Sequence, residues 1–335
     1  GVTTIIIALI TYCLAPIVST QPSWFYVMVI VTVLLLTELK HTFTEFAQRM
    51  KNDEMITLAK FLAISGIILP MLPHKNLIPD INLTPYSIWL ATVVVSGISY
   101  LSYLLKRYVF HESGVLVSGI IGGLYSSTAT ISVLARKSRK ASEQEANEYV
   151  AAMLLAVSMM FLRFMILILI FSREIFTSIY PYLLIMSVVA AVVAWFIHSR
   201  HRRSKDMADE SEDEDSSNPL EFKVALIFAT LFVVFTVLTH YTLVYAGTGG
   251  LNLLSFVSGL SDITPFILNL LQNTGSVAVL VVTACSMQAI ISNILVNMFY
   301  ALFFAGKGSK LRPWILGGFG TVIGVNLVLL LFFYL

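Results

Sequence analysis

The feature that most constrains this chain is a series of apolar runs, each long enough to cross the hydrocarbon core of a bilayer. Such a crossing takes about 20 predominantly apolar residues. Apolar residues make up 57% of the sequence and charged residues only 12%, about half the charged share of a soluble domain. The sequence therefore predicts an all-α polytopic membrane protein. The uninterrupted runs lie at about residues 2–18, 24–39, 55–72, 86–105, 148–171, 179–198, 220–245, 277–304 and 313–335.

Two further stretches are apolar but carry small polar residues in their middle. They read GGLYSSTATISVLA and SGLSDITPFILNLL, and matching positions lie 136 residues apart. Small polar residues that interrupt corresponding hydrophobic segments in two halves of a chain indicate a transporter's binding site. The matching pairs are Gly123 with Gly259, Leu124 with Leu260, and Thr128 with Thr264.

The basic residues predict how these two stretches meet the bilayer. If both stretches cross it, the basic residues divide almost evenly between the two sides. If each stretch enters and leaves on one face, 17 basic residues share one side and only Lys75 and Arg173 lie opposite. The positive-inside rule favours the second arrangement and makes the basic side cytoplasmic. We therefore expect about 9 transmembrane helices plus two re-entrant helical hairpins, with ordinary kinked spans packed through glycine as the alternative.

The same arrangement predicts two repeats and a linker. Each repeat holds three crossings and one hairpin, and because three is odd, the second repeat must be inverted relative to the first. Acidic, polar sequence between the repeats is typical of a disordered segment. The predicted parts are an N-terminal three-helix membrane segment at 1–75, repeat 1 at 84–199 with its re-entrant stretch at 112–138, a disordered charged cytoplasmic linker at 200–218, and repeat 2 at 219–335 with its re-entrant stretch at 249–274.

The hairpin tips are the candidate binding site. Glycine permits the sharp turn, and hydroxyl or carboxylate groups can cap the outgoing helix. Exposed N–H groups at a helix start attract anions, whereas hydroxyls, carboxylates and unwound carbonyls coordinate cations. Alternatively, these groups serve only to satisfy the broken backbone. The substrate-binding candidates are Gly123, Ser126, Ser127, Thr128, Gly259, Ser261, Asp262, Thr264, Asn293 and Asn297.

Asp262 and Arg163 are the candidates for charge coupling. An ionisable group at membrane depth is costly and is a functional hypothesis by default. Asp262 could bind a metal ion, exchange a proton, or act only as a helix cap. Arg163 cannot shed its charge and needs a partner. Pairing with Asp262 is the simplest arrangement, and the pattern leaves open whether such a pair is structural or contacts substrate.

Motifs for enzymatic chemistry are missing from the sequence. It contains no Walker loop, no HExxH and no Ser-His-Asp arrangement, so we predict no enzyme activity and no cofactor. Cys13 and Cys285 both fall in apolar runs, which argues against a disulfide framework.

The runs GIIGGLYSSTATISVLARKSRK, NPLEF and SGLSDIT, with a following SNILVN helix, resemble a known family. It is the membrane domain of unknown function found C-terminal to the MgtC/SapB-type module in bacterial inner-membrane proteins. The resemblance covers nearly the whole chain and implies that it lies in the inner membrane as a multi-pass protein. Longer members carry an N-terminal hydrophobic module, so the resemblance implies that this chain is a truncated or processed form that lacks it. The link to magnesium homeostasis runs through that missing module.

These observations together predict a secondary-active transporter of a small inorganic ion, bound at the midplane between the two tips. Asp262 favours a cation, including a divalent metal. The alternatives are an anion transporter or channel, and a membrane regulator that acts on partner proteins without transport. The expected partners are the ion and the lipid bilayer, with a homodimer as a further option and no nucleic acid.

Overall fold

The computed structural model describes residues 2–20, 22–38, 52–78, 81, 83–110, 114–139, 143–199, 222–272, 278–306, 309 and 311–334. All regular elements in these residues are helices, and one isolated bridge joins Ile78 to Ile81. The predicted all-α class is therefore confirmed. The chain divides into two compact units, Gly1–Leu62 and Ala63–Leu335. The predicted boundary between residues 75 and 84 lies inside the second unit, and the predicted linker at 200–218 lies outside the described residues.

The first unit contains α1 (Val2–Thr20), α2 (Ser23–Glu38) and most of α4 (Asn52–Ala63). Hydroxyl groups in these apolar helices bond to carbonyls of their own helix, as when Thr37 Oγ1 donates to Val33 O at 2.7 Å. This satisfies a polar side chain without help from water, which is the requirement that hydrocarbon surroundings impose.

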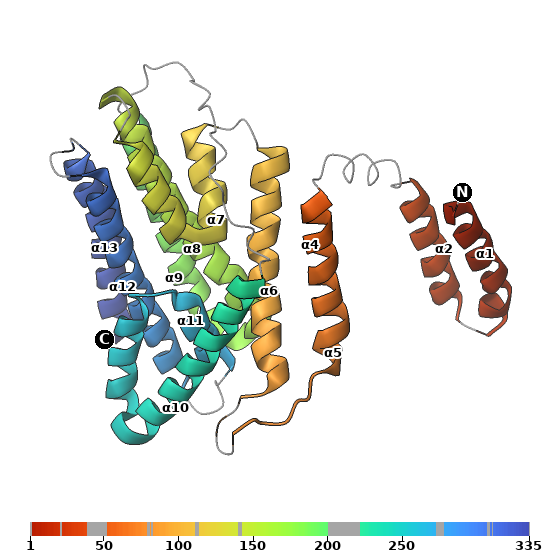
Figure 1. Ribbon diagram of the computed structural model, residues 1–335. Helices are drawn as coiled ribbons and strands as arrows, with labels where there is room; N and C mark the ends of the chain where they lie inside the picture. Colours follow the sequence, from red (N-terminus) through yellow and green to blue (C-terminus); the bar gives the residue numbers. More distant parts are fainter. Residues whose placement is uncertain are drawn as a thin grey trace. The chain divides into compact units, whose positions relative to one another are not determined.

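In the second unit, helix α6 begins with a capping box. Thr84 Oγ1 accepts from the backbone N–H of Ser87 at 3.0 Å, and Ser87 Oγ accepts from the N–H of Thr84 at 3.1 Å. This capping box satisfies two N–H groups that the helix leaves unpaired, and Pro85 follows at the first helical position, where it needs no N–H. The elements are η1 (Ile64–Ile68), α5 (Leu69–Met71), α6 (Pro85–Leu104), η2 (Leu105–Val109), α7 (Val115–Lys137), α8 (Glu143–Phe171) and α9 (Arg173–Ser199) (Figure 1).

The remaining helices are α10 (Phe222–Ser258), α11 (Ile263–Gln272), α12 (Val279–Ala305) and α13 (Arg312–Tyr334). Gly247 interrupts α10 with φ 59° and ψ −153°, a conformation that is essentially restricted to glycine. The chain therefore turns at Gly247, and the last part of α10 is a separate short helix that leads to α11.

Seven described helices are long and apolar enough to cross a membrane, by length and composition. The multi-pass membrane class is therefore confirmed. The N-terminal apolar runs contribute only the shorter stretches Ala8–Thr20, Phe25–Leu35 and Met55–Met71 among the residues that the structure describes, so the predicted number of about nine crossings stays a prediction. One of the seven is Val115–Lys137, the first interrupted stretch, which the sequence analysis did not count as a crossing.

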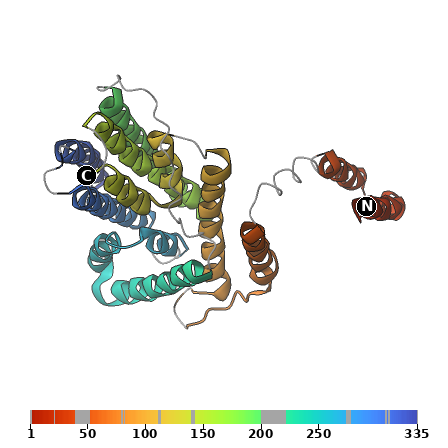
Figure 2. The same ribbon diagram turned by 45° about the horizontal axis from the view of Figure 1, so that its top comes forward.

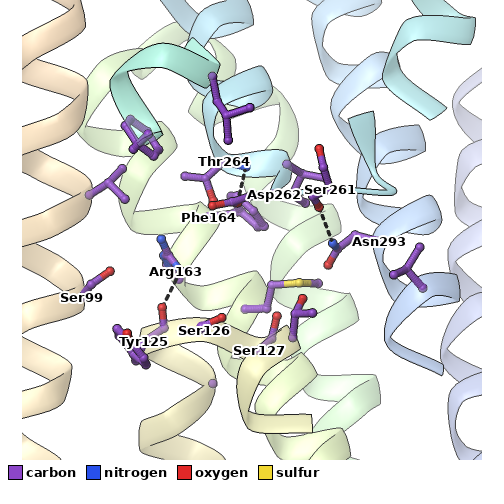
Figure 3. Close-up of a pocket in the computed structure, with 18 of the residues that line it drawn as sticks. Ser99, Tyr125, Ser126, Ser127, Arg163, Phe164, Ser261, Asp262, Thr264 and Asn293 are labelled. Carbon is purple, nitrogen blue, oxygen red and sulfur yellow. Dashed lines mark hydrogen bonds between the residues drawn. The ribbon is translucent and has the colours of Figure 1, made fainter. Parts of the chain in front are cut away.

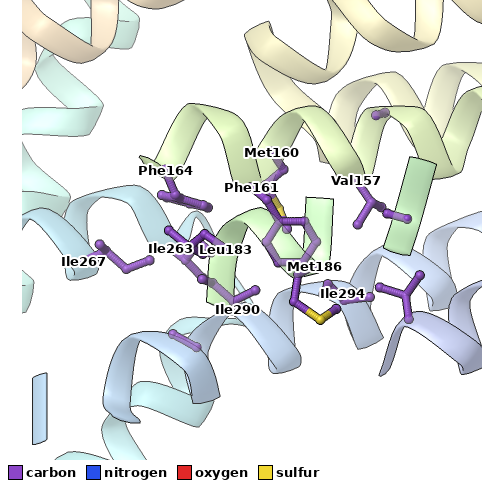
Figure 4. Close-up of a cluster of buried hydrophobic side chains, with 14 of the residues drawn as sticks. Val157, Met160, Phe161, Phe164, Leu183, Met186, Ile263, Ile267, Ile290 and Ile294 are labelled. Carbon is purple, nitrogen blue, oxygen red and sulfur yellow. The ribbon is translucent and has the colours of Figure 1, made fainter. Parts of the chain in front are cut away.

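The core of the second unit lies between α8, α9 and α12. Phe161, Met186, Ile290 and Ile294 are fully buried there (Figure 4). Because lipid tails are as apolar as these side chains, close packing rather than escape from water holds such helices together. Helices α8, α9, α12 and α13 lie side by side in two views (Figures 1 and 2).

Hydrogen bonds between helices reinforce this packing. Ser158 Oγ donates to Ser187 O at 2.8 Å, and Ser187 Oγ donates to Ser158 O at 3.1 Å, so the pair locks α8 to α9. The Tyr182 hydroxyl donates to Asn326 Oδ1 and ties α9 to α13. These hydrogen bonds join α8, α9 and α13.

Candidate functional site

The two interrupted stretches each break where the sequence predicts and meet at one cavity. Ser126 leaves the helical conformation inside α7, with φ −158° and ψ 107°. The second break is the turn between Ser258, where α10 ends, and Ile263, where α11 begins. Residues from both breaks line a cavity of about 380 Å³ (Figure 3). This volume suits a small solute, since ligand sites typically enclose about 300–1,000 Å³.

The chain reverses direction at the first break. A Cβ placed on Gly122 would lie 2.5 Å from Thr130 Oγ1, whereas eight residues of straight helix span about 12 Å. Residues Val115–Tyr125 and Ser127–Lys137 are therefore two arms that lie against each other. We call them the incoming and outgoing arms of α7.

Glycines let the incoming arm approach α8 closely. A Cβ on Gly119 would lie 2.3 Å from Ala152 O, and a Cβ on Gly123 would lie 2.5 Å from Ala156 Cα. Both clashes are with backbone atoms, so only glycine fits at this distance. Because the residue numbers at these two contacts increase in the same direction along both helices, the incoming arm runs parallel to α8.

The second break packs against α12 in the same way. A Cβ on Gly259 would lie 2.3 Å from Ser292 Cβ and 2.7 Å from Ala289 O. Four residues earlier, Ser255 Oγ donates to Gln288 Oε1 at 2.9 Å. This segment of α10 therefore runs parallel to α12, as the incoming arm runs parallel to α8.

The packing repeats at the spacing that the sequence motifs have. The contact between residues 119 and 152 recurs between 255 and 288, and the contact between 123 and 156 recurs between 259 and 292. Every position is displaced by the same 136 residues as the motifs. The spacing of the sequence motifs thus recurs in the contacts that the two interrupted stretches make with α8 and α12.

Arg163 of α8 reaches the first break. Its Nη1 donates to Tyr125 O at 2.8 Å, the last carbonyl of the incoming arm (Figure 3). Its Nε is buried and has no hydrogen-bond partner. Asp262 attracts the guanidinium electrostatically, but Arg163 forms no direct ion pair with any carboxylate in the described part of the chain. The direct pairing with Asp262 that the sequence suggested is therefore replaced by a bond to a carbonyl.

Asp262 caps α11. Its Oδ1 accepts from the backbone N–H of Thr264 at 3.0 Å, a contact of the kind that stabilises a helix start by about 1 kcal/mol. The rest of the side chain is exposed in the cavity. The cap and a role in binding are compatible, because an aspartate has a second oxygen.

Asn293 and Asn297 of α12 form a polar chain behind the second break. Asn297 Nδ2 donates to Asn293 Oδ1 at 3.1 Å, and Asn293 Nδ2 lies 3.4 Å from Gly259 O and 3.5 Å from Ser261 O. Asn293 therefore holds carbonyls that the broken helix leaves unpaired. The Oδ1 of Asn297 is buried without a partner.

Most of the predicted site residues come together, and two do not line the cavity. Gly259 faces α12 instead, and Asn297 is enclosed one turn beyond Asn293. The predicted residues that line the cavity are Gly123, Ser126, Ser127, Thr128, Ser261, Asp262, Thr264, Asn293 and Arg163.

Four polar residues of the lining were not among the predicted site residues: Ser96 and Ser99 of α6, Tyr125 of α7 and Tyr300 of α12. The two serines lie three residues apart and so share a helix face, a weak signal inside an apolar run. Among the described residues, Asp262 is the single acidic side chain on the cavity wall, and no cluster of three His, Cys, Asp or Glu side chains suited to a metal ion occurs there.

Comparison with known proteins identifies a family. The family described as "Domain of unknown function (DUF4010)" matches residues 93–305, and the chain belongs to it. An uncharacterized protein of Aquifex aeolicus (strain VF5) is 27% identical over 221 residues, which cover 65% of this chain and 94% of that protein. No solved structure matches.

Proposed function

We propose that this member of the family is a secondary-active transporter of a small inorganic ion in the bacterial inner membrane. The ion binds in the cavity between two re-entrant tips, which belong to two inverted repeats. One observation carries the proposal: the two breaks, which lie in the matching stretches of the sequence, line the same cavity and place polar and charged side chains on its wall, in an otherwise apolar helical unit. Non-helical backbone at membrane depth is tolerated where it is buried in protein or lines a watery cavity.

The geometry of α7 supports a re-entrant hairpin. Its incoming arm runs parallel to α8, although only residues 138–142 separate α7 from α8. A straight α7 followed by so short a connection would run antiparallel to α8. The reversal at Ser126 returns the chain to the side from which it entered.

The contacts of α12 support the inversion. Arg139, just before α8, donates from Nη2 to Phe303 O at 3.3 Å near the end of α12. The guanidinium of Arg136 lies 4.4 Å from the ring centroid of Phe304. Because α8 begins beside the place where α12 ends, the two equivalent helices point in opposite directions.

The lining supports an ion as the cargo. Asp262 and the backbone carbonyls of the second break favour a cation. Arg163 favours the alternative cargo, an anion. The second alternative, a regulator without transport, is supported less well because the tips enclose a cavity instead of sealing against each other. The proposal includes the resemblance of this chain to the membrane domain found C-terminal to the MgtC/SapB-type module.

Ion binding by the purified chain in lipid nanodiscs tests the proposal. After elemental analysis, the protein is titrated with Na⁺, K⁺, Mg²⁺, chloride, phosphate and sulfate. We expect at least one ion to bind and, for a cation, Asp262→Asn to weaken binding at least tenfold, about 1.4 kcal/mol. Ser158→Ala is the matched control, because Ser158 is buried in α8 but does not line the cavity.

Either of two results would contradict the proposal. One is that no ion of the panel binds to the folded protein. The other is that binding occurs with equal affinity when residues of both breaks are replaced, which would place the ion elsewhere.

A further inference from the structure

The cavity has one fixed charge of each sign on its wall. Arg163 lies against the first break, where it bonds to Tyr125 O, and Asp262 forms part of the second break (Figure 3). The two groups attract each other but do not touch. A cavity of about 380 Å³ thus lies between two charges that a direct ion pair would have neutralised.

Arg163 lacks a full set of acceptors. A guanidinium has five N–H donors and no way to lose its charge in a protein. The bond to Tyr125 O uses Nη1, and Nε is buried without a partner. An unpaired buried donor is expensive, so the site calls for an acceptor that is not part of the described chain.

The first break surrounds this guanidinium with groups that suit an anion. Ser126, Ser127 and Thr128 all line the cavity. Ser126 Oγ accepts from the N–H of Ala129 at 3.3 Å, which marks the start of the outgoing arm. The positive end of that helix therefore faces the same space as Arg163.

The second break has the opposite preference. Asp262 uses one oxygen to cap α11, and its side chain is exposed on the cavity wall. Ser261 O accepts a long 3.5 Å contact from Asn293 Nδ2. A carboxylate oxygen and a carbonyl oxygen are ligands for a small cation.

Electroneutrality connects the two subsites. The wall charges cancel while the cavity is unloaded, and an ion of either sign alone would leave a net charge inside the membrane. One anion and one cation together restore the balance, and each then faces a wall charge of opposite sign. Separated, unneutralised charge at membrane depth is costly, so joint occupancy is favoured over either ion alone.

We infer that the cavity binds a small inorganic anion at Arg163 and the first break together with a cation, H⁺ or Na⁺, at Asp262. The inference rests on the proposed transport function and deepens it, because it makes the protein an anion–cation symporter. The titratable groups that face Asp262 across the cavity are Tyr125, Arg163 and Tyr300. No second carboxylate competes for the cation on the described wall.

Thermodynamic linkage tests the inference. If two ions bind jointly, each must raise the affinity for the other by the same factor. Binding of chloride, phosphate and sulfate to the full chain in nanodiscs is measured at acidic and alkaline pH, and with Na⁺ or choline as the salt cation. We expect the affinity for one anion to rise at least tenfold either at acidic pH or in the presence of Na⁺. A rise at acidic pH identifies the cation as H⁺, and a rise with Na⁺ identifies it as Na⁺.

Three variants locate the two ions. Asp262→Asn keeps the helix cap, so it should bind the anion with an affinity that no longer depends on pH or Na⁺. Arg163→Gln should lose anion binding, and Arg163→Lys, which keeps the charge but not the fork of donors, should bind more weakly than wild type. The lysine variant covers the case in which the glutamine variant does not fold, and melting curves report folding for all three.

The outcomes separate this inference from the proposed function. Ion binding that is independent of the second ion would overturn the pairing and leave transport of a single ion standing. Anion binding that survives in folded Arg163→Gln would also overturn it. The absence of any ion binding would overturn both.

Discussion

The close approach of α7 to α8 depends on Gly123, and adding one methyl group there should show it. A Cβ on Gly123 would lie 2.5 Å from Ala156 Cα and 2.7 Å from Ala156 O. Carbon atoms in ordinary contact lie about 3.5–4.0 Å apart. Because both obstacles are backbone, the incoming arm must move away from α8 by roughly 1 Å in Gly123→Ala, given that contact distance.

Overpacking of this kind costs about 1–3 kcal/mol. At roughly 2–4 °C for each kcal/mol, the melting temperature of the purified protein should fall by roughly 2–12 °C. The displaced arm also carries Tyr125, whose carbonyl holds Arg163 at 2.8 Å. Gly123→Ala should therefore weaken ion binding as well as stability.

Gly320→Ala is the matched control, because a Cβ on this α13 glycine meets nothing within 4 Å. It removes the same backbone freedom from a helix and should leave the protein unchanged or more stable by up to about 1 kcal/mol. Equal melting temperatures for the two variants would refute the argument that Gly123 is required for close packing.

Two further experiments test other parts of the fold. Gly247→Ala should destabilise the protein by about 1–3 kcal/mol, because φ at this position is 59°. Gly249→Ala should have little effect, since a Cβ there meets nothing within 4 Å. Thermal unfolding of both variants measures the difference, and equal stability of the two variants would refute a turn at Gly247 that requires glycine. The losses of stability in Ser158→Ala and Ser187→Ala should be strongly non-additive, because each hydroxyl bonds to the carbonyl of the other serine. A double-mutant cycle should give a coupling energy of about 0.6–2 kcal/mol. Additive losses would show that the two serines do not act as a unit.

The positions of the two breaks could be predicted from the sequence because their causes are local. Glycine, a capping hydroxyl or carboxylate, and proline near a helix start act on the backbone within a few residues. The recurrence of these signals after 136 residues made an accidental match improbable. The structure breaks the chain at Ser126 and before Ile263, inside the two stretches that the motifs define.

The direction in which each residue faces could not be predicted in the same way. Gly259 and Asn297 belong to the polar pattern but face α12 and the protein interior, because rotation of a helix about its axis is set by packing with its neighbours. Ser96 and Ser99 reach the cavity for the same reason.

The partner of Arg163 was also hidden from sequence reasoning. A sequence suggests pairs of side chains, and Asp262 was the acidic residue that it placed at the same membrane depth as Arg163. The acceptor is instead the carbonyl of Tyr125, which exists as an open acceptor only because the helix breaks at the next residue. A break in a helix thus exposes backbone carbonyls as acceptors, and the residue types in the sequence do not reveal them.

Access of water to the two breaks from both faces of the membrane tests the central claim most directly. Cys13 and Cys285, the two native cysteines, are first replaced, and single cysteines are then placed at Ser126 and Ser261 in proteoliposomes. A membrane-impermeant thiol reagent is applied to one face at a time, with Gly320→Cys as a control outside the cavity. The transport account predicts that each cavity cysteine reacts from both faces while the control does not, because the cavity opens to the two sides in turn. Cysteines that react from neither face, or from one face under every ionic condition, would contradict it.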